Sequence, residues 1–332
     1  MEAYIKAISY YLPPTIVTNE QLVKEFPEWT VDKIADKVGV SRRHIAADMT
    51  ISEMATKAAE QLFSENPNID RNCIDFVLVC TQSPDYFLPS TACLVQAKLG
   101  LRNECGAFDF NLGCSGYEYG LATAKGYISA GIAHNILLIT SEAYNKHIHA
   151  LDKGNRTIFG DAATATLIST DGFARIGGFV LGTDGSGAEN LIIKTGGTAH
   201  PAKREDLSID ENGNPHSSDH LYMNGAAIFN FTLRCVPKMV RNTLESNRLE
   251  AKDIDLYIFH QANSFMLTHL RKKMKIDEDK FLIDMASTGN TVSSTIPIAL
   301  YNAKQSGRLH GTVLLAGFGV GLSWGACILN CQ

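Results

Sequence analysis

The chain has 332 residues, of which 45% are apolar and 20% are charged, which predicts a well-buried globular protein of one large or two medium domains. Its net charge of −5 excludes the broad basic surface that binds nucleic acid. We therefore expect no nucleic-acid partner.

The first residues, from Met1 to Lys6, have no basic stretch followed by an apolar core, so we expect no signal peptide. The eight cysteines include no Cys-x-x-Cys pair and are too sparse for a small disulfide scaffold. Several of them lie in apolar, strand-like runs, which suits a compartment where thiols stay reduced. These features predict a cytoplasmic protein.

Apolar runs without alternation predict strands of a sheet that is covered on both faces, as at Phe76–Val79 and Ile136–Ile139. Helical periodicity between such strands predicts an α/β fold. The expected helices are Ser52–Ser64, Tyr117–Ala130, Ala227–Ser246, Ser264–Met274 and Val292–Ser306.

Cys114 lies in a Gly-Cys-Ser-Gly turn between an apolar strand, Ala107–Phe110, and the helix expected from Tyr117. A thiol in the first turn of a helix faces unpaired N–H groups and the positive end of the helix dipole. Such surroundings lower the pKa of a cysteine and make it a nucleophile. The alternative is that Cys114 is a small buried hydrophobic residue.

Two later segments invite other interpretations. Residues 199–220 are polar and predict a surface excursion. Its histidines, His216 and His220, have i, i+4 spacing, yet in so polar a run we expect a solvated loop rather than a metal site. The apolar segment Thr312–Leu329 contains four glycines, so we expect two buried strands and a turn rather than a membrane helix.

The chain also repeats its own pattern. An Ile-Asp pair before an apolar strand occurs at residues 74 and 254, and strand–turn–helix units surround both Cys114 and Asn290. This predicts two similar α/β halves that face each other. We expect residues 1–170 to form the half with the cysteine and 221–332 to form the other half, with 171–220 as a connecting segment.

The second half supplies two more candidates for a site at the junction. His260 ends a buried strand and opens a polar turn, where catalytic groups are often found, although a hydrogen-bonded structural histidine has the same pattern. Asn290 lies in a strand–helix turn, where asparagine is usually a cap. The repeat places Asn290 at the position equivalent to Cys114.

Together these features resemble the thiolase superfamily, and specifically the β-ketoacyl-acyl carrier protein synthase III family. The motifs that carry the resemblance span nearly the whole chain: Arg42-Arg-His-Ile-Ala46, Pro89-Ser-Thr-Ala-Cys93, Leu112-Gly-Cys-Ser-Gly116, Ile158-Phe-Gly-Asp161, His260-Gln-Ala-Asn263, Gly289-Asn-Thr291 and Phe318-Gly-Val-Gly321. The resemblance implies a thiolase-like fold of two pseudo-symmetric halves in a five-layer α-β-α-β-α sandwich.

The resemblance implies a two-step reaction in which Cys114 takes an acyl group from acyl-CoA. Backbone N–H groups of Cys114 and Val320 would form the oxyanion hole. His260 and Asn290 would donate hydrogen bonds to malonyl-acyl carrier protein as it loses CO2 and attacks the acyl-cysteine. No metal and no permanently bound cofactor is implied. The expected partners are acyl-CoA, acyl carrier protein and a second copy of the chain, with no membrane partner.

Further residues carry over from the family with departures. The resemblance assigns CoA binding to Trp29, Lys153, Arg156, Gly225 and Asn263, with Lys153 in place of an arginine. It assigns the acyl pocket to Leu88 and Phe318. Leu88 replaces a common phenylalanine, which predicts a primer longer than acetyl. The resemblance assigns carrier-protein docking to Arg271, Lys272 and Lys273, although a short basic run of this kind is usually a solvated helix end.

Two alternatives to the condensing enzyme stay open. The first is an acyltransferase on the same fold that moves the acyl group to a hydroxyl or an amine. The second is an inert subunit that shapes a complex, against which the intact Cys114 argues. The departures also leave open whether the enzyme serves fatty-acid synthesis or a specialised pathway.

Overall fold

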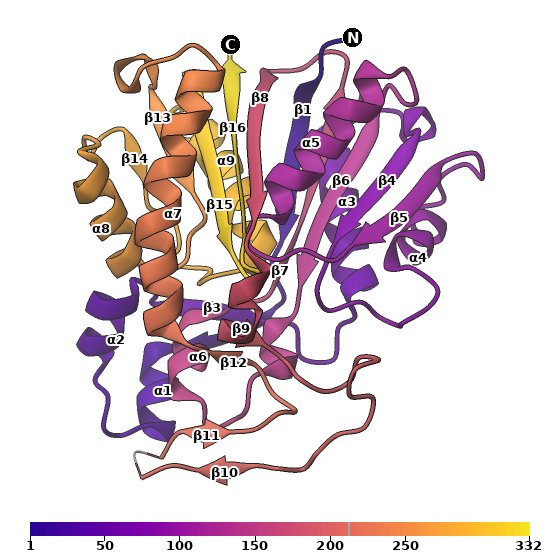
Figure 1. Cartoon of the computed structure of the whole chain (residues 1–332). Helices are drawn as coiled ribbons and strands as arrows, with labels where there is room; N and C mark the ends of the chain where they lie inside the picture. Colours follow the sequence, from indigo (N-terminus) through magenta and orange to yellow (C-terminus); the bar gives the residue numbers. More distant parts are fainter. Residues whose placement is uncertain (212) are drawn as a thin grey trace.

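The structure, a computed structural model, describes residues 1–211 and 213–332. Ten strands form its main sheet: β1 (Tyr4–Tyr11), β4 (Phe76–Cys80), β5 (Gly106–Phe110), β6 (Ile136–Glu142), β7 (Ala162–Ser169), β8 (Ala174–Thr183), β13 (Leu256–Phe259), β14 (Phe281–Leu282), β15 (Gly311–Gly319) and β16 (Ser323–Cys331). Their order across the sheet is β14-β13-β15-β16-β8-β1-β7-β6-β4-β5 (Figure 1).

The helices of the described residues are α1 (Asn19–Glu25), α2 (Val31–Val38), α3 (Ile51–Glu65), α4 (Thr91–Lys98), α5 (Gly116–Ser129), α6 (Lys153–Ile158), α7 (Gly225–Ser246), α8 (Ser264–Met274) and α9 (Thr295–Gln305). The five helices expected from the sequence are confirmed as α3, α5, α7, α8 and α9. The last of them is preceded by a short 3-10 turn, Val292–Ser294, so its α-helical part starts three residues later than expected.

The sheet confirms the internal repeat. From the centre of the sheet outward, the order β1-β7-β6-β4-β5 on one side matches β8-β16-β15-β13-β14 on the other. In each half the three outer strands are parallel to one another, and the two inner strands pair in antiparallel fashion. The halves meet where Tyr4 and Ile5 of β1 pair with Arg175 and Ala174 of β8.

One expected boundary was wrong. Residues 171–220 were expected to be a connecting segment and a surface excursion, but β8 lies within them and pairs along most of its length with β16. The second half of the sheet therefore begins at Ala174 rather than at 221. The interrupted pattern of β8, with glycines at 177 and 178, hid this strand from the sequence analysis.

Successive side chains of a strand point to opposite faces of the sheet, and the core that each one joins shows which helices cover each face. In β4, Leu78 faces a core shared with α5 and α9, whereas Val77 and Val79 face a core shared with α3 and α4. In β15, Leu315 faces the shared core and Leu314 faces the core under α7 and α8. Helices α5 and α9 thus form a buried layer between the halves, which gives the expected α-β-α-β-α order.

A smaller group of elements covers one end of the sheet. It contains α1, α2 and α6 with the two-stranded pair β2 (Thr15–Thr18) and β3 (Arg42–Ile45). The fully buried Arg43 ties this group together, because its guanidinium donates to Asn19 Oδ1 at 2.8 Å and to the Thr157 carbonyl at 2.7 Å. Both chain termini lie at the opposite end (Figure 1).

The described part of residues 199–220 is a largely exposed excursion that contains the pair β10 (Ser208–Ile209) and β11 (Pro215–His216). It lies at the end of the molecule away from the termini (Figure 1). His216 contacts Asp210 and His220 contacts Ser217. Residue 212 of this segment lies outside the described residues.

The apolar segment 312–329 forms the hairpin β15–β16, which confirms the prediction of two buried strands. Among the described residues, no helix is long and apolar enough to cross a membrane.

Glu118 is a fully buried carboxyl group in α5. Two glycines make room for its side chain: a Cβ on Gly317 would lie 2.3 Å from Glu118 Oε2, and a Cβ on Gly325 would lie 2.9 Å from Glu118 Cβ. Neither carboxyl oxygen has a hydrogen-bond partner among the described residues. Burial therefore raises the pKa of Glu118 well above its usual value, and the folded protein holds this carboxyl in its neutral form.

We expect Glu118→Gln to remove a pH dependence of stability. Because the folded-state pKa is raised, the wild-type protein loses free energy of unfolding as pH rises above about 4.5, at about 1.4 kcal/mol per pH unit while only the unfolded state has lost the proton. Unfolding curves of wild type and variant should nearly coincide at pH 5 and diverge by pH 8, with the variant more stable. Glu245→Gln, on the surface of α7, is the control. Parallel pH profiles for wild type and Glu118→Gln would contradict this account.

Candidate active site

The carboxyl ends of the parallel strands of both halves meet at one place. In the first half, Gln82, Cys114 and Tyr144 follow β4, β5 and β6. In the second half, His260, Asn290 and Val320 follow β13, β14 and β15. Polar groups can gather at this edge because the chain leaves the sheet there, so its side chains no longer have to pack against the apolar faces of the sheet.

Cys114 is 6% exposed and lies two residues before the first residue of α5. Ser115, the N-cap, fixes this turn because its hydroxyl lies 2.6 Å from that of Ser323 in β16. The expectation of a lowered pKa for Cys114 was wrong for the unliganded protein. Burial raises the pKa of Cys114 to about 12, which outweighs the hydrogen bonds from the N–H groups of Val320 and Cys114 that lower it. Cys114 is therefore a neutral thiol at rest.

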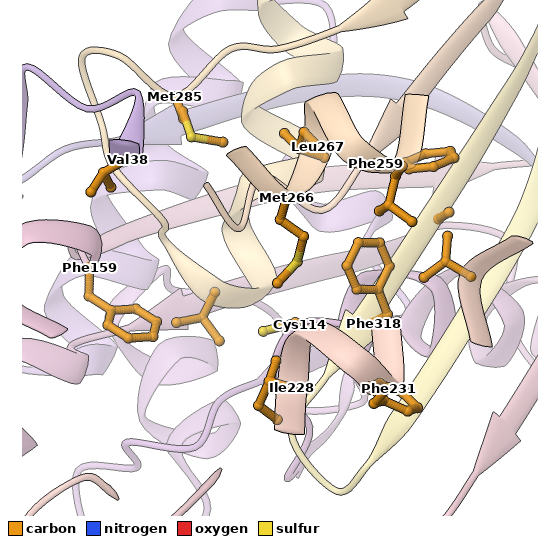
Figure 2. Close-up of a cluster of buried hydrophobic side chains, with 14 of the residues drawn as sticks. Val38, Cys114, Phe159, Ile228, Phe231, Phe259, Met266, Leu267, Met285 and Phe318 are labelled. Atoms are coloured by element: carbon orange, nitrogen blue, oxygen red, sulfur yellow. The ribbon is translucent and has the colours of Figure 1, made fainter. Parts of the chain in front are cut away.

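The surroundings of the thiol explain this burial. Figure 2 shows Cys114 within a cluster of hydrophobic side chains that includes Ile228, Met266 and Phe318. Gly319 closes the other side, because a Cβ there would lie 2.8 Å from both Cβ and Sγ of Cys114. Only a residue without a side chain fits at position 319 while the sulfur keeps its place.

We therefore expect Gly319→Ala to slow acylation of Cys114 by about 100-fold, the cost of displacing a reacting atom by about 1 Å. The initial rate of mass increase with acyl-CoA measures this effect. Gly126→Ala, in α5 with no atom within 4 Å of the new Cβ, is the matched control and should react like wild type. A folded Gly319→Ala protein with the wild-type rate would refute the steric argument.

His260 is 2% exposed, and its backbone N–H donates to the Ala316 carbonyl of β15 at 2.8 Å. Burial lowers the pKa of His260 to about 3, so the imidazole is neutral at physiological pH. Its Nδ1 lies 2.8 Å from Thr295 Oγ1, and this hydroxyl also lies 3.1 Å from the Val292 carbonyl. The Thr295 hydroxyl has one proton. If it donates to Nδ1 of His260, the ring proton is on Nε2, which then donates; if it donates to the Val292 carbonyl, the ring proton is on Nδ1 and Nε2 accepts.

Asn290 is 5% exposed and its backbone is joined to the first half of the chain. Its N–H donates to the Ile158 carbonyl at 2.9 Å, and its carbonyl accepts from Gly160 at 3.0 Å. Its side-chain oxygen accepts from the Val292 N–H at 2.9 Å, which turns Nδ2 toward Nε2 of His260 at 3.5 Å. The structure thus brings the two predicted donors together at one point of the junction.

The predicted CoA residues lie at the end of the molecule that holds α1, α2 and α6. Trp29 is partly buried, and the ammonium groups of Lys33 and Lys37 lie 4.9 and 5.8 Å from its ring centroid. These lysines add positive charge that the sequence analysis did not identify. Lys153 forms an ion pair with Glu28 at 2.6 Å, and Arg156 forms one with Glu25. Phosphate binding by these two residues therefore has to compete with carboxylates.

Two other predicted CoA residues begin helices. Gly225 is the first residue of α7 and lines a cavity of about 380 Å³ beside α6. Asn263 is the N-cap of α8, and its Oδ1 accepts from the Met266 N–H at 2.8 Å. Both lie at helix N-termini, where backbone N–H groups favour anionic ligands.

The predicted acyl-pocket residues lie apart. Phe318 is buried, and its ring centroid lies 5.8 Å from that of His260. Leu88 is 82% exposed in a surface loop, so it contributes no wall next to Cys114 within its own chain. In the predicted docking cluster, Arg271 forms an ion pair with Glu278 at 3.0 Å, while Lys272 and Lys273 are exposed at the end of α8.

Some residues of the site were not found by sequence reasoning. Gln82 and Tyr144 contact each other through a hydrogen bond from the tyrosine hydroxyl to the Gln82 carbonyl oxygen. Gln82 follows β4, which pairs with β5 before Cys114, and Tyr144 follows β6, which pairs with β4. Their positions at the ends of neighbouring strands were the available signal. Among residues 1–211 and 213–332, no three His, Cys, Asp or Glu residues are grouped to hold a metal ion.

Known proteins are similar to this chain over nearly its whole length. A family model described as 3-oxoacyl-[acyl-carrier-protein] synthase III C terminal matches residues 244–331, and one described as 3-oxoacyl-[acyl-carrier-protein] synthase III matches 108–185. The β-ketoacyl-[acyl-carrier-protein] synthase III of Lactococcus lactis subsp. cremoris is 36% identical and that of Streptococcus sanguinis is 34% identical, each over 99% of both chains.

Solved structures give the same result. One of a 3-oxoacyl-(acyl-carrier-protein) synthase III has a TM-score of 0.96 at 44% identity and covers 99% of this chain and 100% of that one. A 3-oxoacyl-(acyl-carrier protein) synthase from Burkholderia xenovorans has a TM-score of 0.90 at 34% identity, covering 100% of this chain and 95% of that one.

Two pseudo-symmetric halves that meet at a buried cysteine define the thiolase-like class of acyl-transferring enzymes. The close agreement in sequence and structure narrows this class further. The chain belongs to the β-ketoacyl-acyl carrier protein synthase III family.

Proposed function

We propose that this enzyme loads an acyl group from acyl-CoA onto Cys114 and then condenses it with malonyl-acyl carrier protein to give β-ketoacyl-acyl carrier protein and CO2. The observation that carries the proposal is the convergence of Cys114, His260 and Asn290 at the junction of the halves, in a chain of this family. The resting thiol and imidazole are both neutral, so charge appears only when a substrate is attacked.

In the first half-reaction, Cys114 Sγ forms a bond to the thioester carbon and its proton leaves with the CoA thiol. The N–H groups of Cys114 and Val320 already face the sulfur, which supports their assignment to the oxyanion hole. In the second half-reaction, loss of CO2 leaves an enolate whose oxygen needs two neutral donors. We assign this role to Asn290 Nδ2 and His260 Nε2, which lie 3.5 Å apart; Nε2 carries the proton it needs when Thr295 donates to Nδ1.

The substrates also need a route to the cysteine. We assign the CoA nucleotide to the surface around Trp29, where Lys33 and Lys37 provide charge for its phosphates. Lys153, Arg156, Gly225 and Asn263 stay candidates for further CoA contacts. The exposed Lys272 and Lys273 are the better candidates for carrier-protein docking, because Arg271 is engaged by Glu278.

We further propose a cytoplasmic homodimer. All eight cysteines are free thiols, which suits a reducing compartment. Tyr86, Phe87 and Leu88 are 61%, 88% and 82% exposed in consecutive positions, and a second copy of the chain would cover such an apolar loop. Leu88 would then act as a pocket residue across that interface.

The test separates condensation from simple acyl transfer. Wild-type enzyme with radiolabelled acyl-CoA and malonyl-carrier protein should release CO2 and give a β-ketoacyl product. The acyltransferase alternative predicts a labelled acyl-enzyme that passes its label to a hydroxyl or an amine without CO2. Acyl-enzyme that forms but yields no CO2 with a competent carrier protein would overturn the condensation proposal.

A further inference from the structure

A cavity of about 170 Å³ lies beside the turn that carries Cys114. Apolar side chains form one part of its wall, among them Leu191, Leu221 and Val320. Cys114 does not line the cavity, but two lining residues adjoin its turn. The Val320 N–H donates to the Cys114 thiol, and Gly113 packs against Val320 and Gln82, since a Cβ there would lie 2.5 Å from Val320 Cγ1 and 2.5 Å from Gln82 Oε1. Its volume is close to that of protein cavities of roughly 150 Å³ that accept a benzene-sized ligand.

The other part of the wall is polar. The Tyr144 hydroxyl donates to Gln82 Oε1, and Gln82 Nε2 donates to Asn111 Oδ1 at 2.9 Å. Tyr144 is 5% exposed, so this chain of groups begins in the core and runs outward to Asn111. The partly buried His147 also lines the cavity, and burial lowers its pKa, so its ring is neutral.

The chain of hydrogen bonds leaves several groups without a partner among the described residues. Gln82 uses one N–H of its amide, and the Asn111 Nδ2 donors and the His147 ring make no hydrogen bond within the described part of the protein. The Tyr144 oxygen has also given its proton and can accept. A saturated hydrocarbon in the cavity would strip water from the Tyr144 oxygen and from the second N–H of Gln82 and leave them unpaired, which is unfavourable, whereas the exposed Asn111 stays solvated.

We propose that this cavity selects a primer of about four to six carbons that carries an oxygen substituent, a hydroxyl or a carbonyl, beyond its thioester. The inference rests on the proposed function, because it concerns the acyl group that Cys114 receives. The oxygen accepts from Gln82 or Asn111, and a hydroxyl also donates to Tyr144 or His147. The carbon chain packs on Leu191, Leu221 and Val320.

The test compares acylation of wild-type enzyme by butyryl-CoA, hexanoyl-CoA, 3-hydroxybutyryl-CoA and 4-hydroxybutyryl-CoA, with the initial rate of mass increase as the measurement. At least one hydroxylated primer should react about tenfold faster than butyryl-CoA, which corresponds to about 1.4 kcal/mol. In Tyr144→Phe this ratio should fall toward one. Asn111→Ala, at an exposed position, provides a second variant should the first not fold. Tyr301→Phe, which removes a remote hydroxyl bound to Glu65, should keep the wild-type ratio.

The outcomes separate the two proposals. If butyryl-CoA or hexanoyl-CoA acylates Cys114 as fast as both hydroxylated primers, the selectivity is refuted while acyl-CoA priming stands. A hydroxyl preference that survives in both Tyr144→Phe and Asn111→Ala refutes the assignment to this cavity. If none of the four thioesters adds mass to a folded protein, priming by acyl-CoA and the selectivity both fail.

Discussion

Replacing Cys114 with alanine is expected to abolish both acyl-enzyme formation and condensation, with a loss of at least about 10⁴-fold in turnover, because the Cys114 thiol is the group proposed to form the covalent intermediate. The change removes one buried sulfur and leaves the hydrogen bond between Ser115 and Ser323 intact, so the protein should fold. Intact-protein mass spectrometry with acyl-CoA measures the effect, since wild type gains one acyl group and the variant gains none.

The control for this experiment is Cys93→Ala, which removes an exposed thiol in α4 and should leave the added mass unchanged. It also tests for non-specific acylation, because an exposed thiol is the residue that such chemistry would reach first. A mass increase that survives in Cys114→Ala would mean that another group carries the acyl chain. The assignment of the nucleophile would then be wrong.

Asn290→Ala is expected to retain self-acylation within about tenfold and to lower condensation by about 10²- to 10³-fold, the usual cost of removing one donor to a developing oxyanion. His260→Ala should follow the same pattern. The physical reason is the proposed division of roles: these two side chains, which lie 3.5 Å apart, would donate to the enolate, whereas backbone N–H groups would hold the thioester oxygen of the first step. Single-turnover acylation and product formation with malonyl-carrier protein are measured separately.

His310→Ala, an exposed imidazole after α9, is the control for the loss of a histidine. Because burial lowers the pKa of His260 to about 3, the condensation rate should show no imidazole titration between pH 5 and pH 8. Loss of acylation in both Asn290→Ala and His260→Ala would assign these residues to the first half-reaction instead.

The fold was largely predictable because its strands and helices repeat. Unbroken apolar strands such as β6 and periodic helices such as α8 carry strong local signals, and the repeat then fixes how two such sets are arranged. The strand β8 was missed because its glycines and its alternating exposure weaken the apolar pattern, and because its partner β16 is more than 100 residues away. Register between distant strands is set by packing, which a single sequence does not display.

The site was predictable to the extent that motifs mark it. Cys114, His260 and Asn290 lie in turns with distinct residue patterns, whereas Tyr144 and Gln82 come from segments without one. The direction of the Cys114 pKa was wrong because the turn was considered alone. Residues from β15 and from α7 and α8 bury the sulfur, and no feature near position 114 shows that they do. The ion pairs of Lys153 and Arg156 were missed for the same reason.

The buried pair of α5 and α9 has a consequence for any attempt to divide this protein. Each helix belongs by sequence to one half, yet α5 packs on strands of both halves and α9 does the same. Neither half can bury its own apolar helix alone, so separately produced fragments should aggregate rather than fold. The spacing between nucleophile and donors is therefore a property of the undivided chain.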